Sequence, residues 1–192
     1  MLHRPSKLYR AIAPELQAHS HISPPIANPF PEEPLALSAE EGFGFFPAHL
    51  GTLLNNSRYE VLRKLGRGQF SSTWLASDSL EETPTYHAIK ILTAHATKRH
   101  QDGELLELEA MQAITESAKS PVLPYMVDHF EMDGPHGRHL CLVLPVLNES
   151  ISSFRHSAPS KRLDPPKVKV IIAEVLEALV ELHAANIIHT GK

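Results

Sequence analysis

Residues 65–75 read LGRGQFSSTWL, and residues 86–92 read YHAIKIL. Both runs are rich in β-branched and aromatic residues, and turn-forming residues separate them, so the sequence predicts two neighbouring strands. The glycines at 66 and 68 would let backbone N–H groups approach a phosphate, because no Cβ stands in the way. A Gly-x-Gly pair by itself favours the simpler interpretation of a tight hairpin.

Lys90 lies in the middle of the second run. A lysine on the concave face of a strand would direct its ammonium into a cleft, where it would neutralise nucleotide phosphates. On an edge strand, the same lysine would instead oppose aggregation. Taken alone, this residue leaves both interpretations open.

Residues 101–117 change to a helical period, with leucines and a methionine on one face. Glu107 is the carboxylate that we expect to hold Lys90, because its apolar neighbours would seat that part of the helix against a sheet. The competing carboxylates are Glu104 and Glu109. The alternative is a solvated acidic face, the commoner role of glutamates on an arbitrary helix.

The composition is that of an ordinary globular protein. The chain has 192 residues, 42% of them hydrophobic, which suits one domain with a tail or a domain cut short. A formal net charge of -4 and a pI near 6.3 give no sign of a nucleic-acid footprint. A single cysteine excludes an intrachain disulfide and a cysteine-based zinc framework. No apolar run reaches the roughly 18 residues that a membrane-spanning helix needs.

Prolines concentrate at the start of the chain, where eight of the 16 fall within residues 1–50. Proline fixes φ and removes a hydrogen-bond donor, so we expect residues 1–41 to form a disordered, proline-rich tail. The first fourteen residues contain two arginines and a lysine but no acid, a weak indication of a mitochondrial presequence. An ordinary tail is favoured, because the prolines would interrupt the amphipathic helix of a presequence.

Strands are also expected at residues 122–131 and 139–144, joined by a turn at residues 133–137. Pro124 weakens the first of these strands, because it cannot donate to a ladder. A long helix is expected over residues 166–185, with Asp164 as its N-cap. Its apolar stripe is broad enough for a helix that is buried on most of its surface.

His136, His139 and Cys141 are spaced closely enough to be candidate metal ligands. His139 and Cys141 fall on the same face of a strand, as two ligands would. No fourth ligand is evident, and we therefore expect scattered residues and no metal site.

In sequence order, the chain has a strand, Gly-x-Gly-x-x-Ser, a strand, an Ala-Ile-Lys strand and a helix with glutamates. This order resembles the small lobe of a protein kinase, and the joint order is far more specific than any one piece. The closest resemblance is to the SR-protein kinase family, which phosphorylates serines in Arg-Ser-rich proteins. The segments that carry it are residues 46–51, 65–75, 127–143 and 176–190, with Ser71 in place of the usual third kinase glycine.

The resemblance implies an α+β fold. Residues 42–147 would hold a docking segment, a kinase small lobe made of a five-stranded antiparallel sheet with one helix, and the hinge. Residues 148–192 would be the truncated start of the helical lobe. The implied partners are ATP and, for the complete enzyme, magnesium and a protein substrate with Ser/Arg-rich segments. No direct contact with nucleic acid or membrane is expected, and the expected location is the cytoplasm, the nucleus or both.

The resemblance also assigns roles to residues. Lys90 would hold the α- and β-phosphates and pair with Glu107. Leu144 would be the gatekeeper, Pro145 would supply a hinge carbonyl to adenine and Leu147 a hinge N–H. Residues 61–66 would line the adenine slot. The implied nucleotide-binding residues are Leu65, Gly66, Arg67, Gly68, Gln69, Phe70, Ser71, Thr73, Ala88, Lys90, Leu144, Pro145 and Leu147.

One departure from the family is large. After His189 and Thr190 the family has a catalytic aspartate, and this chain has Gly191. A catalytic base contributes about 10²–10⁴-fold, so the expectation is an ATP-binding serine/threonine kinase that is truncated and inactive as given. The alternatives are a non-catalytic, pseudokinase-like binding module and the product of an unspliced or mispredicted transcript. The second follows because Gly191-Lys192 can be encoded by GGTAAG, which contains a common intron start.

Overall fold

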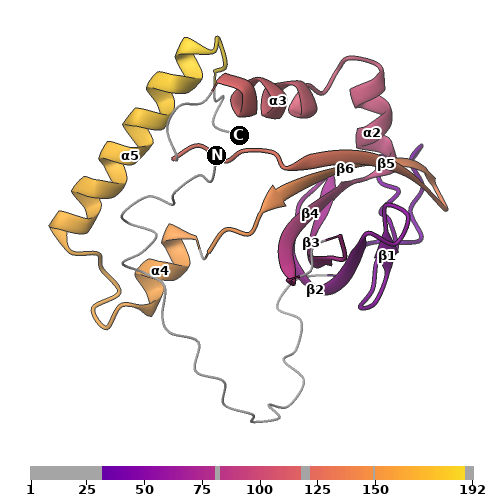
Figure 1. Cartoon of the computed structure of the whole chain (residues 1–192), viewed down its shortest axis with the longest axis horizontal. Coiled ribbons are helices and arrows are strands. Elements are labelled where there is room, and N and C mark those ends of the chain that lie inside the picture. Colours follow the sequence, from indigo (N-terminus) through magenta and orange to yellow (C-terminus); the bar gives the residue numbers. More distant parts are fainter. Residues whose placement is uncertain (1–31, 81–82, 118–121, 149, 189–192) are drawn as a thin grey trace.

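The computed structural model describes residues 32–80, 83–117, 122–148 and 150–188. The basic residues of the suggested presequence and Gly191 lie outside these ranges. The described residues form one antiparallel sheet, flanked by two helices, and two further helices that follow it (Figure 1). None of these helices is long and apolar enough to span a membrane.

The sheet has six strands in the order β1-β2-β3-β4-β6-β5. Their bounds are Leu53–Leu54, Tyr59–Arg67, Ser71–Asp78, Thr85–Leu92, Asp128–Gly134 and Gly137–Pro145, for β1 to β6 in turn. The antiparallel kinase-like sheet expected from the sequence is confirmed, and the two-residue β1 adds a sixth strand. β5 begins at Asp128 and not at residue 122, since Pro124 in the intervening segment has no N–H for a ladder.

The helix expected over residues 101–117 is in fact the second of two. α2 covers Ala94–Gln101 and α3 covers Glu107–Ser117. α2 ends where Gly103 takes a φ of +76°, a left-handed conformation that suits glycine. Thr93 precedes α2 as its N-cap, because its side chain accepts a hydrogen bond from the Ala96 N–H.

Two helices follow the sheet. α4 covers Ile151–Ser157, which the sequence did not predict, and α5 covers Pro165–Ala184, within one residue of the expected helix at each end. Asp164 is the N-cap residue of α5, although its side chain makes no capping bond. No residue of α5 is buried, and Leu176 and Val180 are more than half exposed. The apolar stripe expected to be buried therefore faces outward in the described part of the chain.

The sheet has an apolar core on each face. The larger one includes Trp74, Ile89, Ile91, Cys141 and Val143, and Phe46 and Ala48 pack against it. The smaller one includes Leu92, Ala96, Leu140 and Leu142, with Phe70, Leu105, Leu108 and Leu144 around it. Because side chains alternate along a strand, neighbours such as Ile89 and Lys90 lie on opposite faces. Lys90 therefore lies on the face that carries α2 and α3.

Residues 32–52 cross the face of the larger core before the first long strand. The sequence assigned residues 32–41 to a disordered tail, but here they form turns with their own backbone hydrogen bonds, such as the Phe43 N–H to the Ser38 carbonyl at 3.0 Å. Proline did predict irregular backbone in this segment. Contacts with distant strands, which no local pattern reveals, hold that irregular backbone in place.

Candidate functional site

The structure brings Lys90 and Glu107 together. Lys90 projects from the middle of β4, and its Nζ donates a hydrogen bond to Oε1 of Glu107, the first residue of α3. A carboxylate in the first turn of a helix is favoured by the helix dipole. The competing Glu104 pairs with Arg99 at 2.9 Å, and Glu109 lies 3.6 Å from His100. The lysine therefore has the partner that the sequence favoured.

The glycine-containing turn between β2 and β3 lies beside this pair. The Gly68 N–H donates to the Ser71 carbonyl at 2.8 Å, which closes the turn. A Cβ added at Gly66 would meet no atom within 4 Å, so packing within the chain does not demand a glycine there. The backbone at Gly66 is consequently open to approach from outside.

The turn, the lysine and the two helices enclose a cavity of about 290 Å³. Its lining residues are Gly68, Gln69, Phe70, Ser71, Lys90, Leu92, Ala96, Leu105 and Glu107. Sequence reasoning identified six of them as site residues and missed Leu92, Ala96 and Leu105. Leu92 had a usable signal, because a residue two positions after Lys90 in a strand shares its face. Ala96 and Leu105 belong to the unpredicted α2 and to the loop that follows it.

Three other predicted nucleotide-binding residues, Thr73, Ala88 and Leu144, lie on the same face without lining the cavity. Thr73 is the cross-strand partner of both Gly66 and Lys90. Ala88 is the partner of Leu144 in β6. Pro145 is the last residue of β6, and Leu65 lies one residue before Gly66 in β2. Leu147 follows the strand and is exposed. Thr73, Ala88 and Leu144 therefore continue the Lys90 face toward the segment after β6.

Two expectations differ from the structure. Val61 is buried in the larger core, on the face opposite Lys90, so it does not line an adenine slot. The Arg67 side chain also turns away from the cavity, because its guanidinium donates to the Glu32 carbonyl at 2.9 Å and lies over the Phe45 ring. Both side chains follow the alternation of β2, which a bulge between Lys64 and Gly66 shifts.

The suggested metal ligands have other contacts. Nε2 of His136 lies 2.8 Å from the Leu35 carbonyl, and Nδ1 of His139 lies 2.8 Å from the Leu92 carbonyl. Burial lowers the pKa of His139 and raises the pKa of the Cys141 thiol, which keeps that thiol protonated. The described ranges contain no group of three His, Cys, Asp or Glu side chains that would hold a metal ion.

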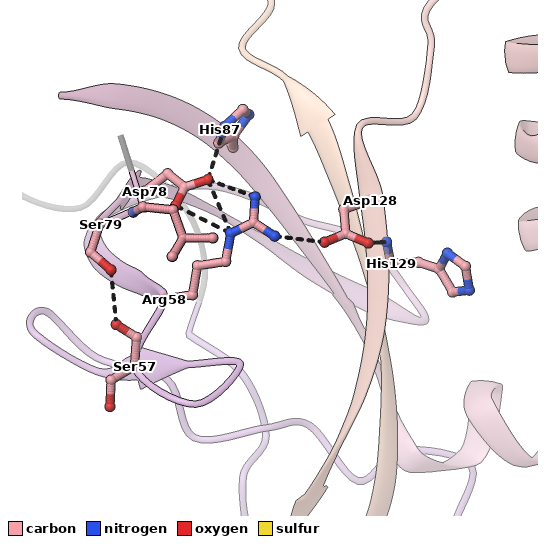
Figure 2. Close-up of polar contacts among 8 residues, drawn as sticks. Ser57, Arg58, Asp78, Ser79, His87, Asp128 and His129 are labelled. Carbon is pink, nitrogen blue, oxygen red and sulfur yellow. Dashed lines mark hydrogen bonds and ion pairs between the residues drawn. The ribbon is translucent and has the colours of Figure 1, made fainter. Parts of the chain in front are cut away.

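A second polar cluster lies at the end of the sheet nearest Pro145 (Figure 2). Arg58 donates to both oxygens of Asp78 and reaches Asp128 with its Nη1 at 2.9 Å. Burial alone would raise the pKa of Asp78, but hydrogen bonds from Arg58 and the Leu80 N–H lower it below its usual value. Both carboxylates of this cluster bond the same guanidinium, an arrangement typical of a structural network.

Comparison with known proteins agrees with this geometry. The protein kinase domain family matches residues 59–190. A solved kinase domain, PF14_0431, superposes with a TM-score of 0.60 at 22% sequence identity, covering 73% of this chain and 39% of that one. The chain therefore belongs to the protein kinase family.

Its relatives give the branch of that family. Mouse SRSF protein kinase 3 is 32% identical over 154 residues, which are 77% of this chain and 26% of that protein. Protein kinase dsk1 of Schizosaccharomyces pombe is 32% identical over 152 residues, with 77% and 27% covered. A serine/threonine protein kinase of Aspergillus fumigatus is 32% identical over 196 residues, covering 98% of this chain and 47% of that protein. The chain is SR-protein-kinase-like and spans a quarter to a half of the length of these relatives.

Proposed function

We propose that this chain is the nucleotide-binding half of a serine/threonine protein kinase of SR-protein kinase type, and that it binds ATP. One observation carries the proposal: the contact between Lys90 and Glu107 beside the glycine-containing turn. An ammonium fixed at that point, next to exposed backbone, suits the phosphates of a nucleotide. A plain hairpin with an edge lysine would need neither the carboxylate partner nor the cavity.

The residues present fit such a ligand. Lys90 lies in a central strand, paired on both sides, which argues against the role of an edge lysine. The open backbone at Gly66 leaves room for a phosphate chain where a Cβ would otherwise stand. Adenine would lie toward Ala88 and Leu144, with the Pro145 carbonyl and the Leu147 N–H as its hinge partners.

The protein groups have distinct tasks in this proposal. Glu107 orients the Lys90 ammonium and keeps it from bonding elsewhere on the sheet. Lys90 then compensates negative charge on the α- and β-phosphates. The turn at residues 66–71 covers the phosphates, and the apolar residues around Leu92 exclude water from one side of the cavity. When bound, ATP supplies the phosphoryl group that kinases transfer.

The activity of the whole protein is part of the proposal. We infer transfer of the ATP γ-phosphate to serine or threonine in proteins with Ser/Arg-rich segments, in the cytoplasm, the nucleus or both. The support is the name SRSF protein kinase carried by relatives of which this chain spans about a quarter. Transfer by the 192-residue chain itself is not expected, because Gly191 stands where the family has its catalytic aspartate.

The test is MgATP binding by calorimetry. We expect Lys90→Met to weaken binding at least about tenfold, because a charged hydrogen-bond partner of the phosphates is lost. Lys98→Met is the matched control, since Lys98 is an exposed lysine of α2 outside the cavity. Unchanged binding by Lys90→Met, or no MgATP binding by the unaltered chain, would contradict the proposal.

A further inference from the structure

The segment at residues 32–46, called here the N-terminal strap, contacts the strand that leads into the glycine-containing turn. Oε1 of Glu33 lies 2.6 Å from Nζ of Lys64, and the two side chains are only 10% and 5% exposed. Lys64 is two residues before Gly66, on the opposite face of the sheet from Lys90. The same ammonium lies 5.7 Å from the centre of the Trp74 ring. A nearly buried ion pair therefore fixes the end of β2 that leads into the turn, from the face of the sheet opposite the cavity.

Arg67 makes the second contact, between the two glycines of the turn. Its Nη1 donates to the Glu32 carbonyl at 2.9 Å, and its guanidinium carbon lies 5.2 Å from the centre of the Phe45 ring. Phe45 is itself buried. One turn residue is thus attached to the strap, while its neighbour Gly68 lines the cavity.

The other end of the strap is attached to elements that do not belong to the turn. The Ala94 N–H donates to the Gly44 carbonyl at 2.8 Å, at the start of α2. Gly44 takes a left-handed φ of +75°, and a Cβ there would lie 3.1 Å from the Cβ atoms of both Ala94 and His136. His136, in the β5–β6 turn, lies 2.8 Å from the Leu35 carbonyl. The strap therefore joins the glycine-containing turn to the β4–α2 junction.

Stability alone is a weak explanation for the Glu33–Lys64 pair. Removing two charges from water costs about as much as, or more than, their attraction returns. Such pairs are better suited to fixing one geometry than to adding free energy of folding. The geometry fixed here is that of the strand entering the turn.

We infer that the N-terminal strap, through Glu33 with Lys64 and through Glu32 and Phe45 with Arg67, positions the residue 66–71 turn for the nucleotide. This inference rests on the proposed function. Glu33 is a positioning residue in this account, since it acts through Lys64 and does not line the cavity. A turn that is held in its binding geometry binds the nucleotide more tightly than a turn that samples many geometries. The reason is that the apparent affinity scales with the fraction of molecules in the binding-competent geometry.

The experiment uses the full 192-residue chain and the variant Glu33→Gln. We expect MgATP binding to weaken about three- to tenfold by calorimetry, as the competent fraction falls. We also expect faster amide hydrogen exchange in peptides covering residues 65–71. The matched control is Glu60→Gln, the same substitution at an exposed position of β2, with neither change expected.

A charge-swapped double variant, Glu33→Lys with Lys64→Glu, tests the pair itself. It should recover both the affinity and the slow exchange of the unaltered chain, and it decides the matter if Glu33→Gln fails to fold. Weak binding that persists in a folded double variant would overturn the inference, as would unaltered affinity and exchange in Glu33→Gln. If the unaltered chain binds no MgATP, the proposed function fails, and hydrogen exchange at residues 65–71 still tests the strap.

Discussion

Two nitrogens of Arg58 donate hydrogen bonds to Asp78: Nε lies 3.1 Å and Nη2 lies 2.9 Å from Oδ2 of the carboxylate (Figure 2). Asp78 is the last residue of β3, and the remaining nitrogen of Arg58 reaches Asp128, the first residue of β5. β3 and β5 are not neighbours in the sheet, because β4 and β6 lie between them. One side chain therefore joins strand ends that the backbone ladder leaves apart.

We expect Asp78→Asn to lower the free energy of unfolding by about 2 kcal/mol, because it removes the charge that compensates a partly buried guanidinium. Urea unfolding measures this. The control is Asp133→Asn, since that carboxylate is 91% exposed and 3.7 Å from Arg138, so its loss should change stability by less than about 0.5 kcal/mol. Equal effects of the two substitutions would show that Arg58 contributes nothing special.

The free energy of unfolding should decrease as the pH is lowered, because of His139. Burial holds the pKa of this imidazole below its usual 6.5, so the folded state keeps it neutral while the unfolded chain binds a proton. Its contribution is complete above about pH 6.5 and is lost progressively as the pH falls below that value. Thermal unfolding between pH 7.5 and 5.5 should show a steeper loss in the unaltered chain than in His139→Gln. The exposed His129, changed to Gln, should leave the slope as it is.

Gly134→Ala should destabilise the sheet. A Cβ at Gly134 would lie 2.6 Å from Nε2 of His139 and 3.1 Å from the Phe46 ring. His139 is fully buried and packs edge-on against Phe46, so its ring has little space to move aside. We expect a loss of about 1–3 kcal/mol, as for overpacked cores, in denaturant unfolding. Gly66→Ala, which would meet no atom within 4 Å, should cost far less.

The contact between Lys90 and Glu107 should matter for binding more than for folding. The two side chains are 27% and 41% exposed, and exposed ion pairs contribute about 0–1 kcal/mol. Glu107→Gln should therefore leave the free energy of unfolding within about 1 kcal/mol of the unaltered value while weakening MgATP binding. A large loss of stability with unchanged MgATP affinity would mean that the pair is structural.

Much of the small lobe could be predicted from sequence, because its signals are local or fixed by order. The alternation around Lys90 marked β4, and the order of glycines, lysine and glutamate indicated the kinase lobe. α2 was missed because the residues it buries are Ala94, Ala96 and Thr97, which are too small to give a hydrophobic period. The Thr93 N-cap was the available signal.

Contacts between distant, irregular segments could not be predicted. Glu33 and Lys64 are separated by a stretch with no periodicity, so the sequence pattern around either residue does not predict that the two are in contact. Arg58 likewise meets Asp128 across 70 residues of sequence. The full lining of the cavity could not be predicted for the same reason, because Ala96 and Leu105 line it only once α2 and the loop after it are in place.

Trp74 is the single tryptophan of the chain, so its fluorescence can be excited apart from that of the four tyrosines. It is nearly buried in the larger core, where its indole N–H donates to the Ser72 hydroxyl at 3.0 Å. Its emission therefore reports on the unfolding of the sheet and not on that of α5. The far-ultraviolet circular dichroism, in contrast, is weighted toward the 20 residues of that helix. Melting curves recorded by the two optical signals would coincide only if the exposed helix and the sheet unfold as one cooperative unit.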